Sequence, residues 1–206
     1  MKKIIFAASA VAVFAATAGA ASAAPVETTI NINAQVDSKC GISANASSIA
    51  LGDITGANAK VKSTVTEDIA QKLTDSKVIA FCNAPNSTVK VERAVLARVG
   101  ATGTSLTSGG FAQFVRYNLD TSINGLALDS TSTDGGTVVA DRFGGHDSAG
   151  STATHVQFAK AAVNGSAVAS SNGSNETATN WSSLTDRRLA AGDYTGYVTV
   201  ELTPAS

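Results

Sequence analysis

The chain has 206 residues, a formal net charge of −1 at pH 7 and a pI near 6.1. This near-neutral charge argues against a nucleic acid as partner, because proteins that bind DNA or RNA usually carry a basic surface. Only 15% of the residues are charged, which is low for a globular protein, so Ser, Thr, Asn and Gly must supply most of the polar surface. The length fits one domain with a sizeable hydrophobic core.

The N-terminus has the layout of a secretory signal peptide. Lys2 and Lys3 precede an almost unbroken apolar run from Ile4 to Ala18, and Ala21-Ser22-Ala23 forms a small-x-small cleavage signal. A membrane anchor is the alternative, but alanine dilutes the run and no positive stop-transfer flank follows it. We therefore expect residues 1–23 to be removed on export, and the chain to pass through the periplasm to the cell surface or to be secreted.

The segment that follows, residues 24–39, has the pattern of a half-buried strand. Its apolar residues occupy every second position and alternate with Thr and amide side chains: Ile30, Ile32, Ala34 and Val36. A period of two places all four on one face of a strand. The pattern predicts a strand but does not say to which domain it belongs.

The two cysteines of the chain are Cys40 and Cys82. In an oxidising compartment an even number of cysteines indicates disulfides, and two of them allow a single intramolecular pairing. The loop-entropy estimate for a bridge of this span is about 4 kcal/mol. Two free buried thiols are the alternative, and we predict the structural disulfide.

Beyond the first cysteine, short strands are predicted more clearly than helices. Alternating or apolar runs, separated by turn residues, predict strands in these segments: Val78–Cys82, Val89–Val91, Phe111–Leu119, Leu126–Leu128, Val138–Phe143, Val156–Phe158 and Tyr194–Leu202. A short helix capped by Thr66 is the alternative for Ser63–Lys72, whose apolar residues are too few to decide. Asp129–Thr137 and Val163–Asn180 read as long loops. The pattern predicts an all-β fold, a sandwich or a barrel.

Residues for catalysis or metal binding are sparse. The only histidines are His146 and His155. The stretch Gly144–Ser148 contains His, Asp and Ser side by side, whereas a catalytic triad is assembled from separated segments. A metal site built from Asp141, Asp147 and the two histidines lacks tight ligand spacing. We therefore predict no enzyme, no metal and no cofactor. Trp181 near Tyr194 and Tyr197 could form a sugar-stacking platform, although packing is the more common use of one Trp.

Five blocks of the sequence, in order, carry a family resemblance. They are an alternating segment ending in the first cysteine, a Leu-Gly patch, a strand ending in the second cysteine with the strand after it, an aromatic strand with a Tyr-Asn pair, and a Gly-Asp-Tyr element before the last strand: Ile30–Cys40, Leu51–Gly56, Val78–Val91, Val115–Leu119 and Ala191–Leu202. With these blocks the chain resembles the spore coat protein U domain family, which includes the archaic (Csu-type) chaperone–usher pilins. The Gly-Asp-Tyr element is the most specific of the five.

The resemblance implies a fold and a way of assembling. Such pilins are immunoglobulin-like β-sandwiches that lack one strand, and residues 40–206 would form this incomplete domain. A periplasmic chaperone fills the gap first, and the N-terminal strand of the next subunit replaces it after delivery to an outer-membrane usher. Residues 24–39 would be that donor strand, with the apolar row defined above. The groove would be bordered by the last strand, with Val198, Val200 and Leu202 lining it.

The function implied is a structural subunit of a surface fimbria, which serves adhesion and biofilm formation and has like subunits as partners. A surface or glycan receptor is not identified by the sequence. The alternative is a self-contained secreted β-sandwich, either a coat or matrix protein or a ligand-binding module, that does not polymerise. In that case the N-terminal segment is an ordinary strand of its own domain.

Overall fold

The computed structural model describes residues 28–84, 86–103, 106–123, 126–128, 139–140, 156–173 and 183–205. The chain divides into two units, Met1–Val36 and Asp37–Ser206. In the first unit, residues 28–36 form no helix or strand and all are exposed. The predicted signal peptide, residues 1–23, lies outside the described residues, and the proposed domain boundary at Cys40 stays a prediction.

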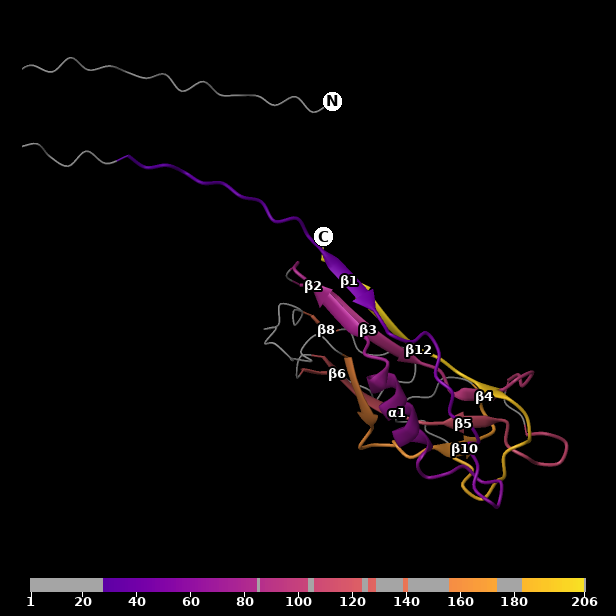
Figure 1. Cartoon of the computed structure of the whole chain (residues 1–206). Helices are drawn as coiled ribbons and strands as arrows, with labels where there is room; N and C mark the ends of the chain where they lie inside the picture. Colours follow the sequence, from indigo (N-terminus) through magenta and orange to yellow (C-terminus); the bar gives the residue numbers. More distant parts are fainter. Residues whose placement is uncertain are drawn as a thin grey trace, which may run out of the picture. The chain divides into compact units, whose positions relative to one another are not determined.

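The described part of the second unit consists of one helix and twelve short strands (Figure 1). Their bounds are β1 (Cys40–Ser43), α1 (Val65–Asp75), β2 (Ile79–Cys82), β3 (Thr88–Arg93), β4 (Leu96–Arg98), β5 (Phe114–Arg116), β6 (Leu119–Ile123), β7 (Leu126–Leu128), β8 (Val139–Ala140), β9 (Val156–Lys160), β10 (Val168–Ser170), β11 (Tyr194–Thr195) and β12 (Val198–Thr203).

The strands form four small antiparallel sheets. Their strand orders are β1-β2, β10-β5-β4-β11, β12-β3-β8 and β7-β6-β9. This arrangement confirms the coarse prediction of a mostly β protein.

The disulfide joins Cys40 of β1 to Cys82 of β2. The two residues lie directly opposite each other in the antiparallel register of these strands, so the bridge is a cross-strand link at one end of the sheet. This confirms the predicted pairing.

The helix left undecided by the sequence is real. Its apolar residues Val65, Ile69 and Ala70 are buried, and they recur at helical spacing. Thr66 is also buried inside the first turn, so it is not the cap that the sequence suggested. The N-cap is Thr64, outside the helix.

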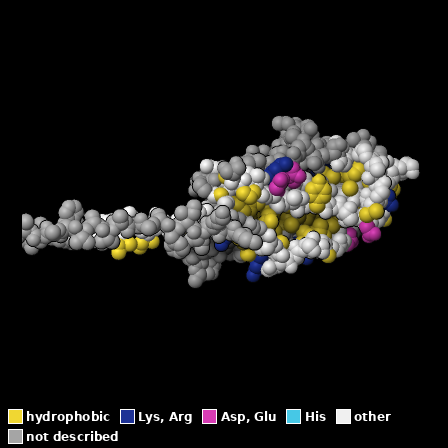
Figure 2. All heavy atoms as spheres, turned by 90° about the horizontal axis from the view of Figure 1, so that it is seen from above, with side chains coloured by type: hydrophobic (Ala, Val, Ile, Leu, Met, Phe, Trp, Pro, Cys, Tyr) yellow, Lys and Arg dark blue, Asp and Glu magenta, His cyan; other side chains and the backbone are white. Residues whose placement is uncertain are grey.

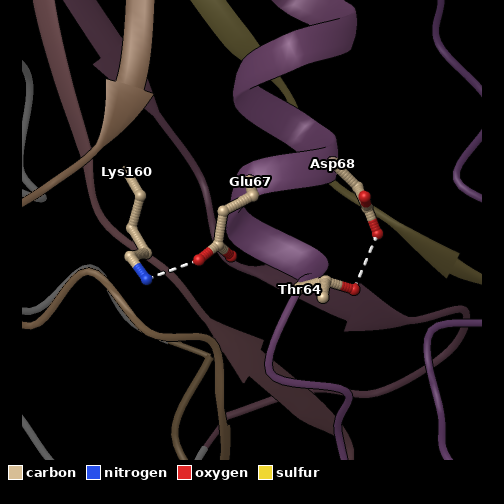
Figure 3. A network of polar contacts seen from close by, with 4 residues as sticks. All are labelled: Thr64, Glu67, Asp68 and Lys160. Carbon is tan, nitrogen blue, oxygen red and sulfur yellow. Dashed lines mark hydrogen bonds and ion pairs between the residues drawn. The ribbon is translucent and has the colours of Figure 1, made fainter.

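The start of α1 is also tied to β9 by polar contacts (Figure 3). The Thr64 hydroxyl donates to the Asp68 carboxylate, with 3.1 Å between the oxygens. Glu67 forms an ion pair with Lys160 of β9. Acidic side chains in a first turn also interact favourably with the helix dipole. In the last turn of α1, the Thr74 hydroxyl donates to the Phe158 carbonyl at 3.2 Å. Both ends of α1 are therefore fastened to the same strand.

Two expectations for the middle of the chain are wrong. The predicted strand Phe111–Leu119 is broken, because β5 ends at Arg116 and β6 starts at Leu119 in a different sheet. The intervening Tyr117 and Asn118 are buried. Side chains at odd and even positions from Phe114 to Leu119 therefore all lie inside the protein, and an alternating pattern cannot reveal where one strand ends and the next begins. The predicted loop 163–180 contains β10, whose Ala169 and Ser170 are buried against β5. Part of this Ser- and Gly-rich segment therefore forms the outer strand of a four-stranded sheet rather than a loop.

The Gly-Asp-Tyr element forms a tight corner before β12. Gly192 has φ +143, and a Cβ built there would lie 2.8 Å from Arg98 Nε, so this position requires glycine. Two residues on, the Tyr194 hydroxyl donates to the Ala190 carbonyl at 2.8 Å. The corner is thus held by one side chain and fixes the point where the final strands begin.

Candidate functional site: an apolar groove beside the last strand

A groove of about 1020 Å³ opens on the second unit beside β12. Most of its lining side chains are apolar, and the ones that define its shape come from five parts of the chain: Ile42, Leu51, Ile54, Leu73, Leu189 and Val200. Figure 2 shows the face seen from above in Figure 1, where apolar side chains gather in an elongated band. Ligand pockets typically measure about 300–1,000 Å³, so this groove is at the upper end of that range.

One wall of the groove is the chain from Ile42 to Thr55. After β1 ends at Ser43, this stretch has no regular secondary structure as far as Ile54. Its start is fixed by the Asn45 amide, which donates to the Ser76 carbonyl at 2.8 Å. The wall is therefore an irregular segment that contributes side chains without belonging to a sheet over most of its length.

The other wall is the end of the chain from Leu189 to Val200. It includes the corner around Tyr194 and the first half of β12. The deepest lining residues are Ile69 of α1 and Tyr117, each 2% exposed. The helix and the buried Tyr117 thus form the base of the groove.

The strands that flank the groove are both outer strands of their sheets. Among the described residues, β1 pairs with β2 alone and β12 with β3 alone. The two outer strands lie beside each other in the fold (Figure 1), yet no ladder joins them. Each therefore presents one edge whose backbone groups are not paired with another strand within the described ranges, and such edges are templates for an added strand.

Burial along β12 fits a core that is incompletely covered here. Val198, Val200 and Leu202 alternate with exposed residues, as the sequence predicts, but they are only half-buried. Their cross-strand partners on β3 are all buried, with Arg93 6%, Val91 8% and Val89 0% exposed. The apolar row of the last strand thus lies at an open margin of the core.

Charge is scarce in this groove. Its charged lining residues are Asp53 and Asp193. Hydrogen bonds from the Thr55 hydroxyl, at 2.7 Å, and from the Thr55 amide, at 2.9 Å, lower the pKa of the Asp53 carboxyl. A lining of this composition suits apolar side chains and backbone hydrogen bonds.

Under the groove, a buried arginine supports Tyr117. The Arg93 guanidinium lies 5.5 Å from the centroid of the Tyr117 ring. It donates to Asn118 Oδ1 from Nε at 3.1 Å and from Nη2 at 2.6 Å. Burial lowers the pKa of Arg93 to about 10 and raises the pKa of Tyr117 to about 12. The sequence interpretation missed this contact, although Arg93 shares the parity of the inward-facing Val89 and Val91.

The predicted site residues fall into three groups. Val198 and Val200 line the groove. Leu202 is half-buried against the core and is not among the lining residues. The apolar row of the N-terminal segment is exposed, with Ile30 80%, Ile32 91% and Val36 82% accessible, and Ala34 is exposed as well. The sequence interpretation did not foresee the contribution of α1 and of residues 42–55 to the groove.

Other candidate residues lie outside the described residues: Asp141, His146, Asp147, His155 and Trp181. Within the residues that are described, no cluster of three metal-ligating side chains occurs. In the same part of the chain, no helix has the length and apolar character needed to cross a membrane.

No protein-family model matches the sequence, and no curated protein or solved structure is significantly similar to the chain. The resemblance to the spore coat protein U domain family therefore stays a prediction from the five sequence blocks.

Proposed function

We propose that the protein is a structural subunit of a surface fimbria that polymerises by donor-strand exchange, in adhesion and biofilm formation. The observation that carries this proposal is an apolar groove at the unpaired edge of the last strand, in a chain whose N-terminal segment exposes an apolar row. In this scheme the segment of one subunit enters the groove of the next.

Features of the second unit support an incomplete immunoglobulin-like sandwich. Sandwiches of this type contain a tyrosine near the start of a late strand whose hydroxyl bonds to the backbone a few residues upstream. Tyr194 makes such a contact with Ala190, four residues earlier. The two outer strands that flank the groove, β1 and β12, are not joined by a ladder within the described ranges, so each keeps an edge for an added strand.

The donor segment has the right pattern for this groove. In an extended strand, successive side chains point to opposite faces. Ile30, Ile32, Ala34 and Val36 would therefore enter the groove together, while Asn31 and Asn33 would face solvent. Burying a Val or Ile side chain contributes roughly 1.5–3 kcal/mol, and backbone hydrogen bonds to the free strand edges would fix the register.

The same geometry accounts for the proposed helper proteins. An open apolar groove with unpaired strand edges favours aggregation. A subunit exported through a signal peptide would thus need a periplasmic chaperone to cover the groove, and an usher at the outer membrane to exchange that cover for a donor strand. These partners belong to the proposal together with the like subunits of the fibre.

A second candidate is a self-contained secreted module that binds a ligand in the same groove. Tyr194 and Tyr197 both line it, and Tyr197 is 57% exposed. Large apolar clefts with a few polar groups are typical ligand sites. In this reading the chain is a stable monomer and the N-terminal segment has no role in assembly.

The change Ile32→Asp separates the two candidates. It would bury a carboxylate in an apolar groove, which costs several kcal/mol. We expect wild-type protein to give a ladder of multimers on unboiled gels, and Ile32→Asp to give none while still being recovered on a co-expressed chaperone. Asn33→Asp is the matched control, because it adds the same charge on the opposite face and should leave the ladder intact. A wild-type protein that stays monomeric without any partner would refute polymerisation and favour the secreted module.

A further inference from the structure

The backbone just before β1 is hydrogen-bonded to Asn83, which follows the second cysteine. Asn83 Oδ1 accepts from the Lys39 amide at 2.5 Å, and Asn83 Nδ2 donates to the Asp37 carbonyl at 3.0 Å. The Asn83 amide itself donates to the Lys39 carbonyl at 3.0 Å. We call these three hydrogen bonds the Asn83 clamp.

The clamp continues the pairing of β1 and β2 past the disulfide. Cys40 and Cys82 are opposite each other in the register, so Lys39 and Asn83 are the next pair along the chain. The backbone bond extends the ladder by one step, and the side chain reaches two residues further, to Asp37. Residues 37–39 are thereby kept alongside Asn83 instead of being available for a turn.

The N-terminal segment of the same chain would compete with a second subunit for the groove. The apolar row of the candidate donor strand ends at Val36, so only residues 37–39 separate that row from β1, and two to five residues are enough for a β-hairpin. A hairpin here would place the donor strand along the free edge of its own β1. A segment tethered so closely has an effective concentration near the millimolar range, far above that of a second subunit.

We propose that the Asn83 clamp prevents the N-terminal segment from folding back into the groove of its own subunit, and so reserves both for a second copy of the chain. This inference rests on the proposed function. A hairpin at residues 37–39 must break the bonds to Asp37 and to both backbone groups of Lys39. Exchange between subunits keeps all three hydrogen bonds, because it needs no turn at residues 37–39.

The test is Asn83→Ala in the full chain, co-expressed with a chaperone in the oxidising periplasm, purified from that chaperone and released at low concentration. Size-exclusion chromatography separates monomers from multimers, and hydrogen exchange with mass spectrometry reports on the peptide spanning residues 28–36 in each fraction. We expect the wild-type peptide to be protected only in multimers. In Asn83→Ala, we expect the monomer fraction to rise at least threefold and its peptide to be protected.

Two further variants keep the test interpretable. Asn58→Ala removes another exposed asparagine whose Oδ1 accepts a backbone amide, that of Lys60 at 3.0 Å, and should behave like wild type. Asn83→Asp keeps the acceptor for Lys39 but loses the donor to Asp37, so its monomer fraction should be intermediate. Asn83→Asp also replaces Asn83→Ala as the test variant if Asn83→Ala folds poorly.

The outcomes are distinguishable. If wild type forms multimers with a protected peptide and the Asn83 variants behave identically, the clamp has no such role and the proposed function stands. If the wild-type monomer already has a protected peptide, the clamp does not prevent folding back. If the peptide exchanges freely in every fraction of every variant, the groove does not take this segment and both proposals fail.

Discussion

Tyr194 and Gly192 show how single residues set the end of this fold. Gly192 supplies a backbone conformation that a side chain would obstruct through Arg98. Tyr194 then ties the corner to Ala190 with its hydroxyl and lines the groove with its ring. Half-burial of this phenol raises its pKa. The corner therefore couples the placement of β12 to the shape of one groove wall.

Removing that hydroxyl should weaken the domain measurably. Tyr194→Phe deletes the hydrogen bond to the buried Ala190 carbonyl, and a bond of this kind is worth about 0.5–1.5 kcal/mol. Urea unfolding followed by circular dichroism should show this loss in the free energy of unfolding. Tyr197→Phe is the control, because Tyr197 is exposed, and it should leave the midpoint unchanged. Equal midpoints for both variants would show that the corner does not depend on the hydroxyl.

At the scale of elements, β12 has two unlike faces and two unlike edges. Its half-buried face carries Val198 and Val200 into the groove, while Thr199 and Glu201 face solvent. One edge is hydrogen-bonded to β3 over its whole length, and the other has no strand partner within the described ranges. The strand is thus built into the domain on one side and open to an added strand on the other.

The open side of β12 can be disabled without touching the donor segment. Val200→Glu would place a charge in the groove, whereas Thr199→Glu would place it in solvent. We expect Val200→Glu alone to form no multimers and Thr199→Glu to form them normally. Mixing Val200→Glu, which keeps its donor segment, with Ile32→Asp, which keeps its groove, should give a heterodimer and nothing longer, measured by native mass spectrometry. Long mixed polymers, or no heterodimer at all, would contradict strand exchange through this groove.

At the scale of the whole molecule, the second unit has a core of its own but an uncovered margin. Residues such as Val65, Phe114 and Val156 are almost fully buried, and the disulfide ties β1 to β2. The apolar residues of β12 and of the wall at residues 42–55 remain partly open. Occupation of the groove should therefore raise the stability of the unit without changing its core.

A synthetic peptide of the donor segment should occupy the groove and stabilise the second unit. A chain starting at Asp37 has the groove but no donor segment, and a synthetic peptide of residues 28–36 can be added in trans. At a hundredfold excess over its dissociation constant, such a ligand stabilises the folded state by about 2.7 kcal/mol. Since 1 kcal/mol shifts the melting temperature of a domain this size by roughly 2–4 °C, we expect a rise of about 5–10 °C. The same peptide with Ile32→Asp should give no shift, and equal shifts for both peptides would contradict specific insertion.

Local patterns in the sequence were enough for the β-rich fold class, the disulfide pairing and the alternation of β12. The first and last depend on a period of two within a short stretch of chain, and the second depends on there being two cysteines, which allow a single intramolecular pairing. The sequence also indicated the apolar row from Ile30 to Val36, which is exposed in the structure.

Only the tertiary structure decided where these pieces meet. The groove is assembled from residues 42–55, α1, the Tyr117 region and the chain end, which are far apart in sequence and whose contacts no local period encodes. The same reason hid the break between β5 and β6, where both faces are buried, and the inward Arg93, whose charge suggests a surface position until its contact with Asn118 is seen. The Asn83 clamp likewise depends on a disulfide-linked pair of strands that brings Asp37 and Asn83 together across 46 positions of the chain.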